Sequence, residues 1–85
     1  MNDTTIHLIR KMLAALSVIG PLGLEEKTIL EQAELAAGFP TTTGERDIAF
    51  QALVEKGWVS RYHQEMTNRI RWYLNEDGKV AMRAL

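Results

Sequence analysis

The stretch LVEKGWVSRYHQEMTNRIRWYLNEDG, residues 53–78, decides the fold because the spacing of apolar residues changes within it. Its first residues continue a helical pattern that Gly57 ends. The segments WVSRYHQ (58–64) and RIRWYL (69–74) are then rich in aromatic and β-branched residues, as strands are. The tetrapeptide EMTN (65–68) lies between them. The stretch therefore predicts a β-hairpin directly after a helix.

Strand alternation assigns the hairpin side chains to two faces. Ile70, Trp72 and Leu74 should face the core. The predicted outer, basic face holds Arg61, His63, Arg69 and Arg71. Four such groups together are typical of phosphate binding, because neutralising phosphates releases counterions. The other interpretation is that arginines on a solvated strand face only prevent pairing with another sheet edge. Both interpretations stay open at this point.

Three helices are predicted before the hairpin. The first begins at a cap residue, Asp3 or Thr4, and ends at Gly20 and Pro21. The second lies within LEEKTILEQAELAAG (24–38), with Ile29, Ala33 and Ala36 as its inward stripe. The third lies within TTTGERDIAFQALVEKG (41–57). There Thr42 and Glu45 have the spacing of a capping box, and Ala49, Phe50 and Leu53 form the inward face.

A short last helix is predicted in NEDGKVAMRAL (75–85), with Asn75 as its cap. Val80, Met82 and Leu85 are its apolar residues, and Gly78 near its start should lower its stability. The fold class is therefore mainly α (α+β): three helices, a two-stranded hairpin and a short C-terminal helix. We expect one domain over residues 1–85, because 85 residues suffice for one modest core.

The formal charge of −1 conceals an asymmetry. Residues 1–55 contain four basic and eight acidic residues, whereas residues 56–85 contain six basic and three acidic ones. Halves of opposite sign bear on the choice of partner rather than on the fold.

The apolar N-terminal segment is the only candidate for a targeting or membrane segment. Its longest uncharged run, 12–24, is too short to span a bilayer and contains Gly20, Pro21 and Gly23. We interpret the segment as a core helix and expect a cytoplasmic protein, in keeping with the lack of cysteine.

The order of elements resembles the winged helix-turn-helix family of bacterial transcriptional regulators. The resemblance rests on the junction ALVEKGWV (52–59) and on WYLNEDGKVAMRAL (72–85), and it covers nearly the whole chain. It implies a recognition helix, 43–56, in the major groove of double-stranded DNA, and a wing on the neighbouring backbone. From the resemblance and the basic hairpin together, the DNA-binding residues that we predict are Thr42, Thr43, Arg46, Gln51, Arg61, His63, Arg69 and Arg71.

The third helix departs from this pattern in its charge. A reading helix usually offers arginine or lysine to bases and phosphates, whereas this one presents Glu45 and Asp47, which repel phosphate. Arg46 occupies a position where the family more often has an apolar residue. The alternative function is therefore a winged-helix module that binds a protein and no nucleic acid.

No constellation for catalysis or metal binding is visible. His7 and His63 lie in different elements, with no ligand at metal-binding spacing, and the glycines do not form a phosphate loop. We expect no enzyme activity, no cofactor and no metal. The wide apolar surface of the first helix has two interpretations, internal packing or a homodimer formed by the first and last helices.

Overall fold

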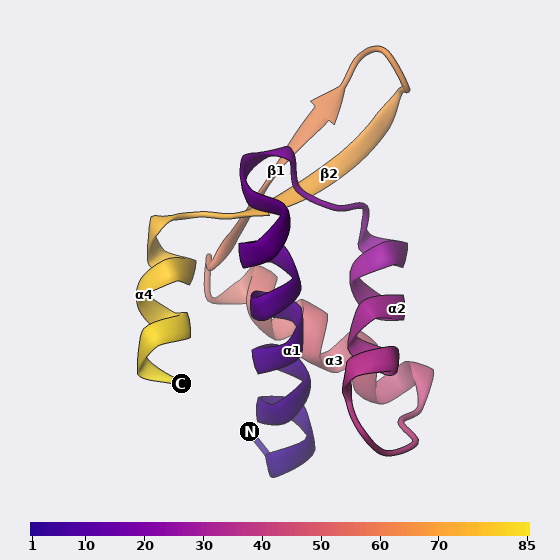
Figure 1. The fold of residues 1–85 in the computed structure, drawn as a ribbon, viewed down its shortest axis with the longest axis vertical. Coiled ribbons are helices and arrows are strands. Elements are labelled where there is room, and N and C mark those ends of the chain that lie inside the picture. Colours follow the sequence, from indigo (N-terminus) through magenta and orange to yellow (C-terminus); the bar gives the residue numbers. More distant parts are fainter.

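Three helices precede an antiparallel hairpin, and a fourth helix closes the chain (Figure 1). The computed structural model describes residues 1–85. The elements are α1 (Asp3–Ile19), the 3-10 turn η1 (Gly20–Leu22), α2 (Glu26–Ala36), α3 (Thr43–Glu55), β1 (Val59–Gln64), β2 (Arg69–Leu74) and α4 (Glu76–Ala84). The predicted fold class, mainly α with a two-stranded hairpin and a short C-terminal helix, is confirmed.

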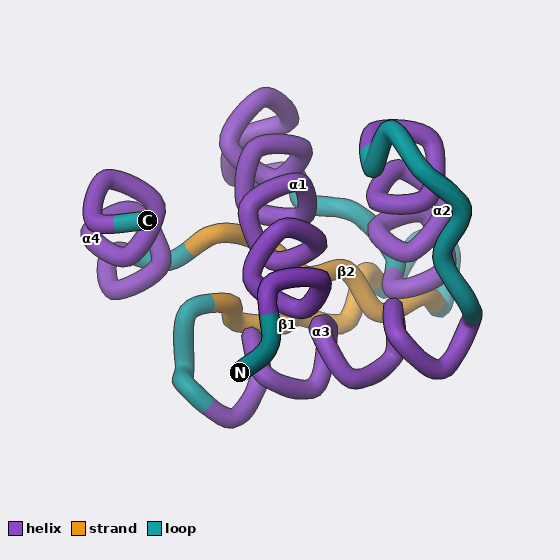
Figure 2. Tube along the Cα trace, turned by 90° about the horizontal axis from the view of Figure 1, so that it is seen from below, coloured by secondary structure: helices purple, strands orange, loops and turns teal.

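Helix α1 is the central element of the core. Its buried residues Leu8, Ile9, Met12, Leu13 and Leu16 pack against α2 on one side and α3 on the other (Figure 2). Its N-cap is Asn2, whose Oδ1 accepts a hydrogen bond from the Thr5 backbone N–H at 2.7 Å. The predicted cap at Asp3 or Thr4 was wrong, because both residues already lie within the helix.

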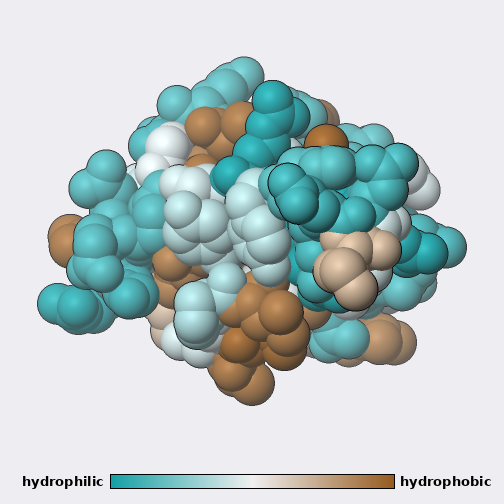
Figure 3. Space-filling view, turned by 90° about the horizontal axis from the view of Figure 1, so that it is seen from above, coloured by the Kyte–Doolittle hydropathy of each residue, from teal (hydrophilic) through white to brown (hydrophobic).

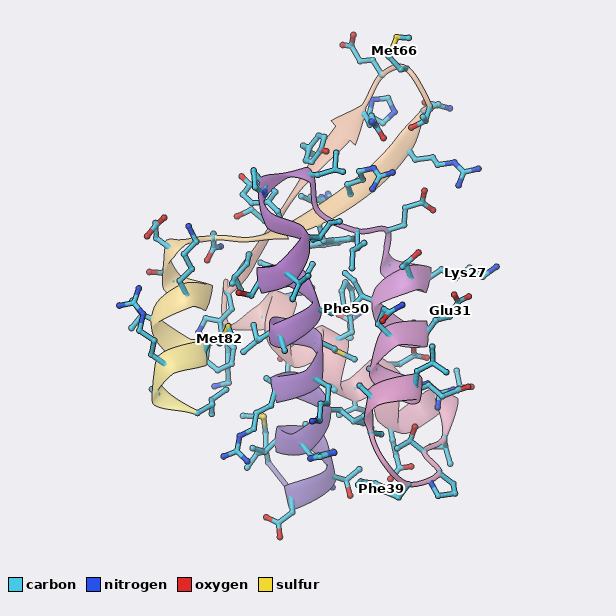
Figure 4. All side chains as sticks on the ribbon, viewed as in Figure 1. Lys27, Glu31, Phe39, Phe50, Met66 and Met82 are labelled. Carbon is cyan, nitrogen blue, oxygen red and sulfur yellow. The ribbon has the colours of Figure 1, made fainter.

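The helices α2 and α3 contribute smaller buried stripes. In α2 the buried residues are Ile29 and Ala33, and Ala37, directly after the end of the helix, also belongs to the core. The predicted inward residue Ala36 is exposed, because the buried stripe continues four residues after Ala33, at Ala37. In α3 the inward residues are Ala49, Phe50 and Leu53, as predicted. Figure 4 shows Phe50 between α1 and α2, at the centre of the molecule.

The hairpin has a register that fixes which side chains share a face. Val59 pairs with Leu74, Arg61 with Trp72, and Gln64 with Arg69. Residues directly opposite one another in an antiparallel pair point to the same side of the sheet. One face, which we call the Arg61 face, carries Val59, Arg61, His63, Ile70, Trp72 and Leu74. The other, the Arg69 face, carries Ser60, Tyr62, Gln64, Arg69, Arg71 and Tyr73.

This register corrects the predicted basic face. Arg61 and His63 lie on one face of the hairpin, and Arg69 and Arg71 lie on the other. Alternation was right within each strand. The error concerned the pairing between strands, which depends on the four-residue turn 65–68 and on the burial of Val59 opposite Leu74.

A short backbone bridge joins the hairpin to the connection between α1 and α2. The Leu24 N–H donates to the Trp72 carbonyl and the Trp72 N–H donates to the Leu24 carbonyl, both at 2.8 Å. The preceding residue, Gly23, has φ +71°, and a Cβ there would lie 2.2 Å from the Trp72 carbonyl oxygen. Only glycine allows this close approach, so Gly23 anchors the base of the hairpin.

Helix α4 meets the body through its smallest residues. Gly78 and Ala81 are its buried residues, whereas Val80, Met82 and Leu85, predicted as its apolar contacts, are 61%, 38% and 37% exposed. The predicted cap is confirmed, because Asn75 Oδ1 accepts from the Gly78 N–H at 2.9 Å. Because Gly78 lies close to the Trp58 carbonyl, the side of α4 that holds Gly78 and Ala81 faces the body, and Val80 points to solvent.

The segment Asp3–Leu22 is long and apolar enough to cross a membrane by length and composition alone. In this structure one side of that segment forms the centre of the core.

Candidate nucleic-acid interface

The outward face of α3 is not covered by any other element. Three residues predicted to contact DNA, Thr42, Thr43 and Gln51, are exposed there. The predicted capping box is confirmed: Thr42 Oγ1 accepts from the Glu45 N–H at 3.1 Å, and Glu45 Oε1 accepts from the Thr42 N–H at 2.8 Å. The Glu45 carboxylate is therefore used at the start of the helix.

Arg46 points back into the turn between α2 and α3. Its side chain is only 11% exposed, and Nη2 lies 2.8 Å from Glu34 Oε2. Nη1 donates to the Thr41 carbonyl at 2.8 Å and to Thr41 Oγ1 at 2.7 Å. The guanidinium thus ties α3 to the end of α2, and few of its donors remain for an external ligand.

Replacing Arg46 by alanine is expected to lower the free energy of unfolding by about 1.5–3 kcal/mol, because hydrogen bonds to a charged group in a largely buried position are lost. Glu34 is 58% exposed. Glu34→Gln should therefore cost less than about 1 kcal/mol. Urea denaturation of both variants measures the difference. Equal stability of Arg46→Ala and the parent would contradict a structural role for Arg46.

The Arg61 face lies on the α3 side of the hairpin. On this face, the ring of Trp72 packs edge-on against the ring of Phe50 in α3, with the ring centroids 5.2 Å apart. Arg61 is exposed, has no carboxylate partner, and lies 5.8 Å from the centroid of the Trp72 ring. His63, further along the strand, makes a 2.7 Å contact from Nε2 to Asn68 Oδ1. Arg61 is therefore the permanent cation of the hairpin that faces the α3 side without a counter-charge.

The Arg69 face is tied to the connection between α1 and α2. Arg69 Nη1 lies 3.0 Å from Glu25 Oε1, and Arg71 Nη1 donates to the Gly23 carbonyl at 3.1 Å. Arg71 Nε also donates to Gln64 Oε1 at 2.8 Å, and the Tyr62 hydroxyl donates to the Leu22 carbonyl at 2.7 Å. Arg71 is thus largely committed within the chain, whereas the Arg69 side chain is 63% exposed and keeps free donors.

Sequence reasoning missed two features of this surface. The first is that Glu25, at the start of α2, is the carboxylate that pairs with a hairpin arginine, Arg69. The acidic pair at 25–26 was visible in the sequence, but the contact spans 44 residues. The second is Lys56 at the end of α3, which is exposed and lies 5.4 Å from the centroid of the Trp58 ring. Its position directly before Gly57, the residue that ends the third helix, was the sequence feature that could have indicated this exposed cation.

His7 connects two parts of the chain. It is half-buried, and its Nε2 lies 2.7 Å from the Ala37 carbonyl oxygen. Its ring stacks on Phe39, with centroids 5.2 Å apart. His7 therefore joins α1 to the loop before α3, at the end of the molecule where Figure 4 labels Phe39.

The four predicted hairpin residues and the four predicted α3 residues thus fall into three groups. Thr42, Thr43 and Gln51 are exposed on α3; Arg61 and His63 lie on the hairpin face that turns toward α3; and Arg46, Arg69 and Arg71 have partners within the chain. The exposed surface of α3 also carries Asp47, Ile48 and Glu55. Its potential is therefore mixed, acidic on the helix and basic on the neighbouring hairpin face.

Comparison of the chain with protein-family models, with curated proteins and with solved structures finds no match in any of the three. The structure itself supplies the topology. Three helices followed by a two-stranded antiparallel hairpin and a C-terminal helix are consistent with a winged-helix-like fold.

Proposed function

We propose that this chain is a cytoplasmic, non-enzymatic winged helix-turn-helix protein that binds double-stranded DNA and regulates transcription. The observation that carries the proposal is one of placement: α3, whose outward face is uncovered, and the hairpin, which packs on α3 through Trp72 and Phe50, lie on the same side of α1 (Figure 2). A helix in a major groove and a hairpin on the adjacent backbone need this arrangement.

The proposed division of roles follows from the contacts. Thr42, Thr43 and Gln51 offer the hydroxyl and amide groups that read base edges or position phosphates. Arg61 and Lys56 supply cations with no carboxylate partner, and His63 lies on the same hairpin face as Arg61. Arg69 contributes its remaining donors. Arg46 and Arg71 have structural roles in this proposal, because their guanidinium groups hold other parts of the chain.

Replacing Arg61 by glutamine is expected to weaken binding to duplex DNA of any sequence. The slope of log affinity against log salt should fall in magnitude by about one, the loss of one phosphate contact, between about 50 and 200 mM salt. Fluorescence anisotropy with a labelled random-sequence duplex measures this slope. The effect should be independent of sequence, because phosphate contacts position the protein without reading bases.

The matched control is Arg83→Gln. Arg83 is also exposed and without a carboxylate partner, but it lies in the last turn of α4, away from α3 and the hairpin. It should leave the slope unchanged. An Arg61→Gln variant with the parent slope, or an equal change from Arg83→Gln, would remove the hairpin from the proposed interface.

The second candidate function is a protein-interaction module, and a specific observation favours it. A hollow of ≈ 580 Å³ lies between the start of α1 and the outward face of α3. Its lining includes the apolar residues Met1 and Ile48, 66% and 62% exposed, and the acidic residues Asp47 and Glu55. This combination fits a basic amphipathic segment of a partner. Absence of measurable duplex binding by the parent at low salt, where phosphate attraction is least screened, would favour this candidate over DNA.

The predicted homodimer stays a proposal. Hydrophobic residues are exposed at the end of α1 and along α4: Val18 at 89%, Ile19 at 37%, Leu22 at 51% and Val80 at 61%. Figure 3 looks onto the hairpin end of the molecule and shows a hydrophobic group framed by hydrophilic residues. A two-fold pairing there would match a palindromic operator. The mass of the protein in solution tests it.

A further inference from the structure

A second concave site lies on the opposite side of the molecule, between the end of α1, the end of β2 and α4. It is a half-open cavity of ≈ 830 Å³. Figure 1 shows α4 standing apart from α1 along most of its length, and Figure 4 shows Met82 on the side of α4 nearest α1. None of the eight residues predicted to contact DNA lines this cavity.

The cavity lies beside a helix, α4, that packs on the body through two small residues. Gly78 lies so close to the Trp58 carbonyl that a Cβ would be 2.1 Å from its oxygen, and Ala81 is the other buried residue of the helix. Beyond this contact, the space between α1 and α4 is lined by side chains that do not fill it. The accessible apolar part of the lining comes from Met82, Pro21 and the Tyr73 ring, whereas Leu16 and Leu74 also border the cavity but are 0% and 9% exposed.

The polar lining leaves one positive charge without a partner. Lys79 Nζ pairs with Glu76 Oε1 at 3.1 Å, so these two charges offset each other. The Asn75 amide donates to the Gly57 carbonyl at 2.8 Å and to Ser60 Oγ at 3.0 Å, so its donors are used. Arg83 has no carboxylate within ion-pair distance, and the hydroxyls of Ser17 and Tyr73 are not committed to hydrogen bonds within the chain.

We propose that this cavity binds a small organic anion with an apolar body, such as an aromatic carboxylate or sulfonate. The volume lies in the range of small-molecule sites, about 300–1,000 Å³, and the lining combines apolar walls with a few polar groups. A guanidinium offers paired N–H donors that match a carboxylate or sulfonate, and two hydroxyls lie among the same lining residues. The ligand's apolar body would cover the accessible surfaces of Met82, Pro21 and the Tyr73 ring.

The test uses two fluorescent probes that differ only in the sulfonate group, 8-anilino-1-naphthalenesulfonate and its uncharged analogue N-phenyl-1-naphthylamine. The folded parent should bind the sulfonate saturably with one site per chain, and the sulfonate should raise the melting temperature. Arg83→Gln should weaken sulfonate binding about tenfold, because a charge-assisted hydrogen bond is lost. It should leave the binding of the uncharged analogue unchanged. Arg61→Gln, on the hairpin, is the matched control and should bind both probes as the parent does.

Three results would overturn the proposal. The first is no saturable sulfonate binding by the folded parent. The second is equal sulfonate affinity of Arg83→Gln and the parent, which would make the site merely apolar. The third is that the parent is a dimer that binds no probe while a monomeric Val18→Glu variant does, since a second copy of the chain would then fill the cavity. Because none of these measurements involves DNA, failure here and failure of the DNA proposal are distinguishable.

Discussion

Replacement of Trp72 by alanine is expected to lower the free energy of unfolding by about 3 kcal/mol. This is the lower end of the range for deleting a buried aromatic ring, since the Trp72 side chain is half-buried and not enclosed. Its ring meets Phe50 edge-on, a geometry that aromatic pairs favour. The guanidinium of Arg61 lies over the same ring on the hairpin face. For an 85-residue chain the loss is a large share of the total stability.

Ile70→Ala is the matched control. Ile70 lies on the same face two residues nearer the turn and is 46% exposed, so its truncation should cost less than about 1 kcal/mol. Urea denaturation followed by far-ultraviolet circular dichroism measures both variants. If Trp72→Ala melts like the parent, or if Ile70→Ala is the more damaging change, the Arg61 face does not pack on α3.

Gly78→Ala is the second prediction, and its sign is opposite to what helix propensity alone suggests. Alanine is intrinsically better than glycine in a helix by about 1 kcal/mol. At this position, however, the new Cβ would lie 2.1 Å from the Trp58 carbonyl oxygen and 2.6 Å from Leu74 Cδ1. The backbone oxygen cannot rotate away, so α4 must move. We expect a net loss of about 1–3 kcal/mol, typical of overpacking.

Gly44→Ala is the matched control, and for this variant we expect a gain in stability where Gly78→Ala should cause a loss. Gly44 is also in the first turn of a capped helix, but the nearest atom to its added Cβ is Thr42 Oγ1 at 3.9 Å. This substitution should raise stability by about 0.4–1 kcal/mol, because it reduces the freedom of the unfolded chain. Two thermal melts compare the variants. A stabilised Gly78→Ala protein would show that α4 does not pack on Trp58.

These two glycines illustrate how far the sequence went. Gly78 was recognised as unfavourable in a helix, but its reason is a contact with Trp58, 20 positions earlier in the chain. The capping box at Thr42 and the cap at Asn75 were read directly, because both involve residues three apart. Local rules therefore located the elements, and the ends of α3, β1, β2 and α4 agree closely with the predicted segments.

The candidate site shows the limit of the same rules. The types and positions of its residues were visible in the sequence, since Thr42, Thr43 and Gln51 are indeed exposed on α3. The grouping of the four hairpin residues was wrong, because alternation fixes faces within one strand only. Which face of β1 lies beside which face of β2 depends on the register, and a shift of one residue would reverse it.

The sequence by itself determined the order of helices and strands, the caps of α3 and α4, the inward stripe of α3 and the concentration of basic residues after position 55. Each of these depends on spacing along a few turns or on composition. Only the tertiary structure decided that Arg46 pairs with Glu34, that Arg69 pairs with Glu25 and that Arg71 holds the Gly23 carbonyl. The physical reason is that ion pairs and hydrogen bonds need atoms within about 3–4 Å, and no local pattern says which distant segment will supply them.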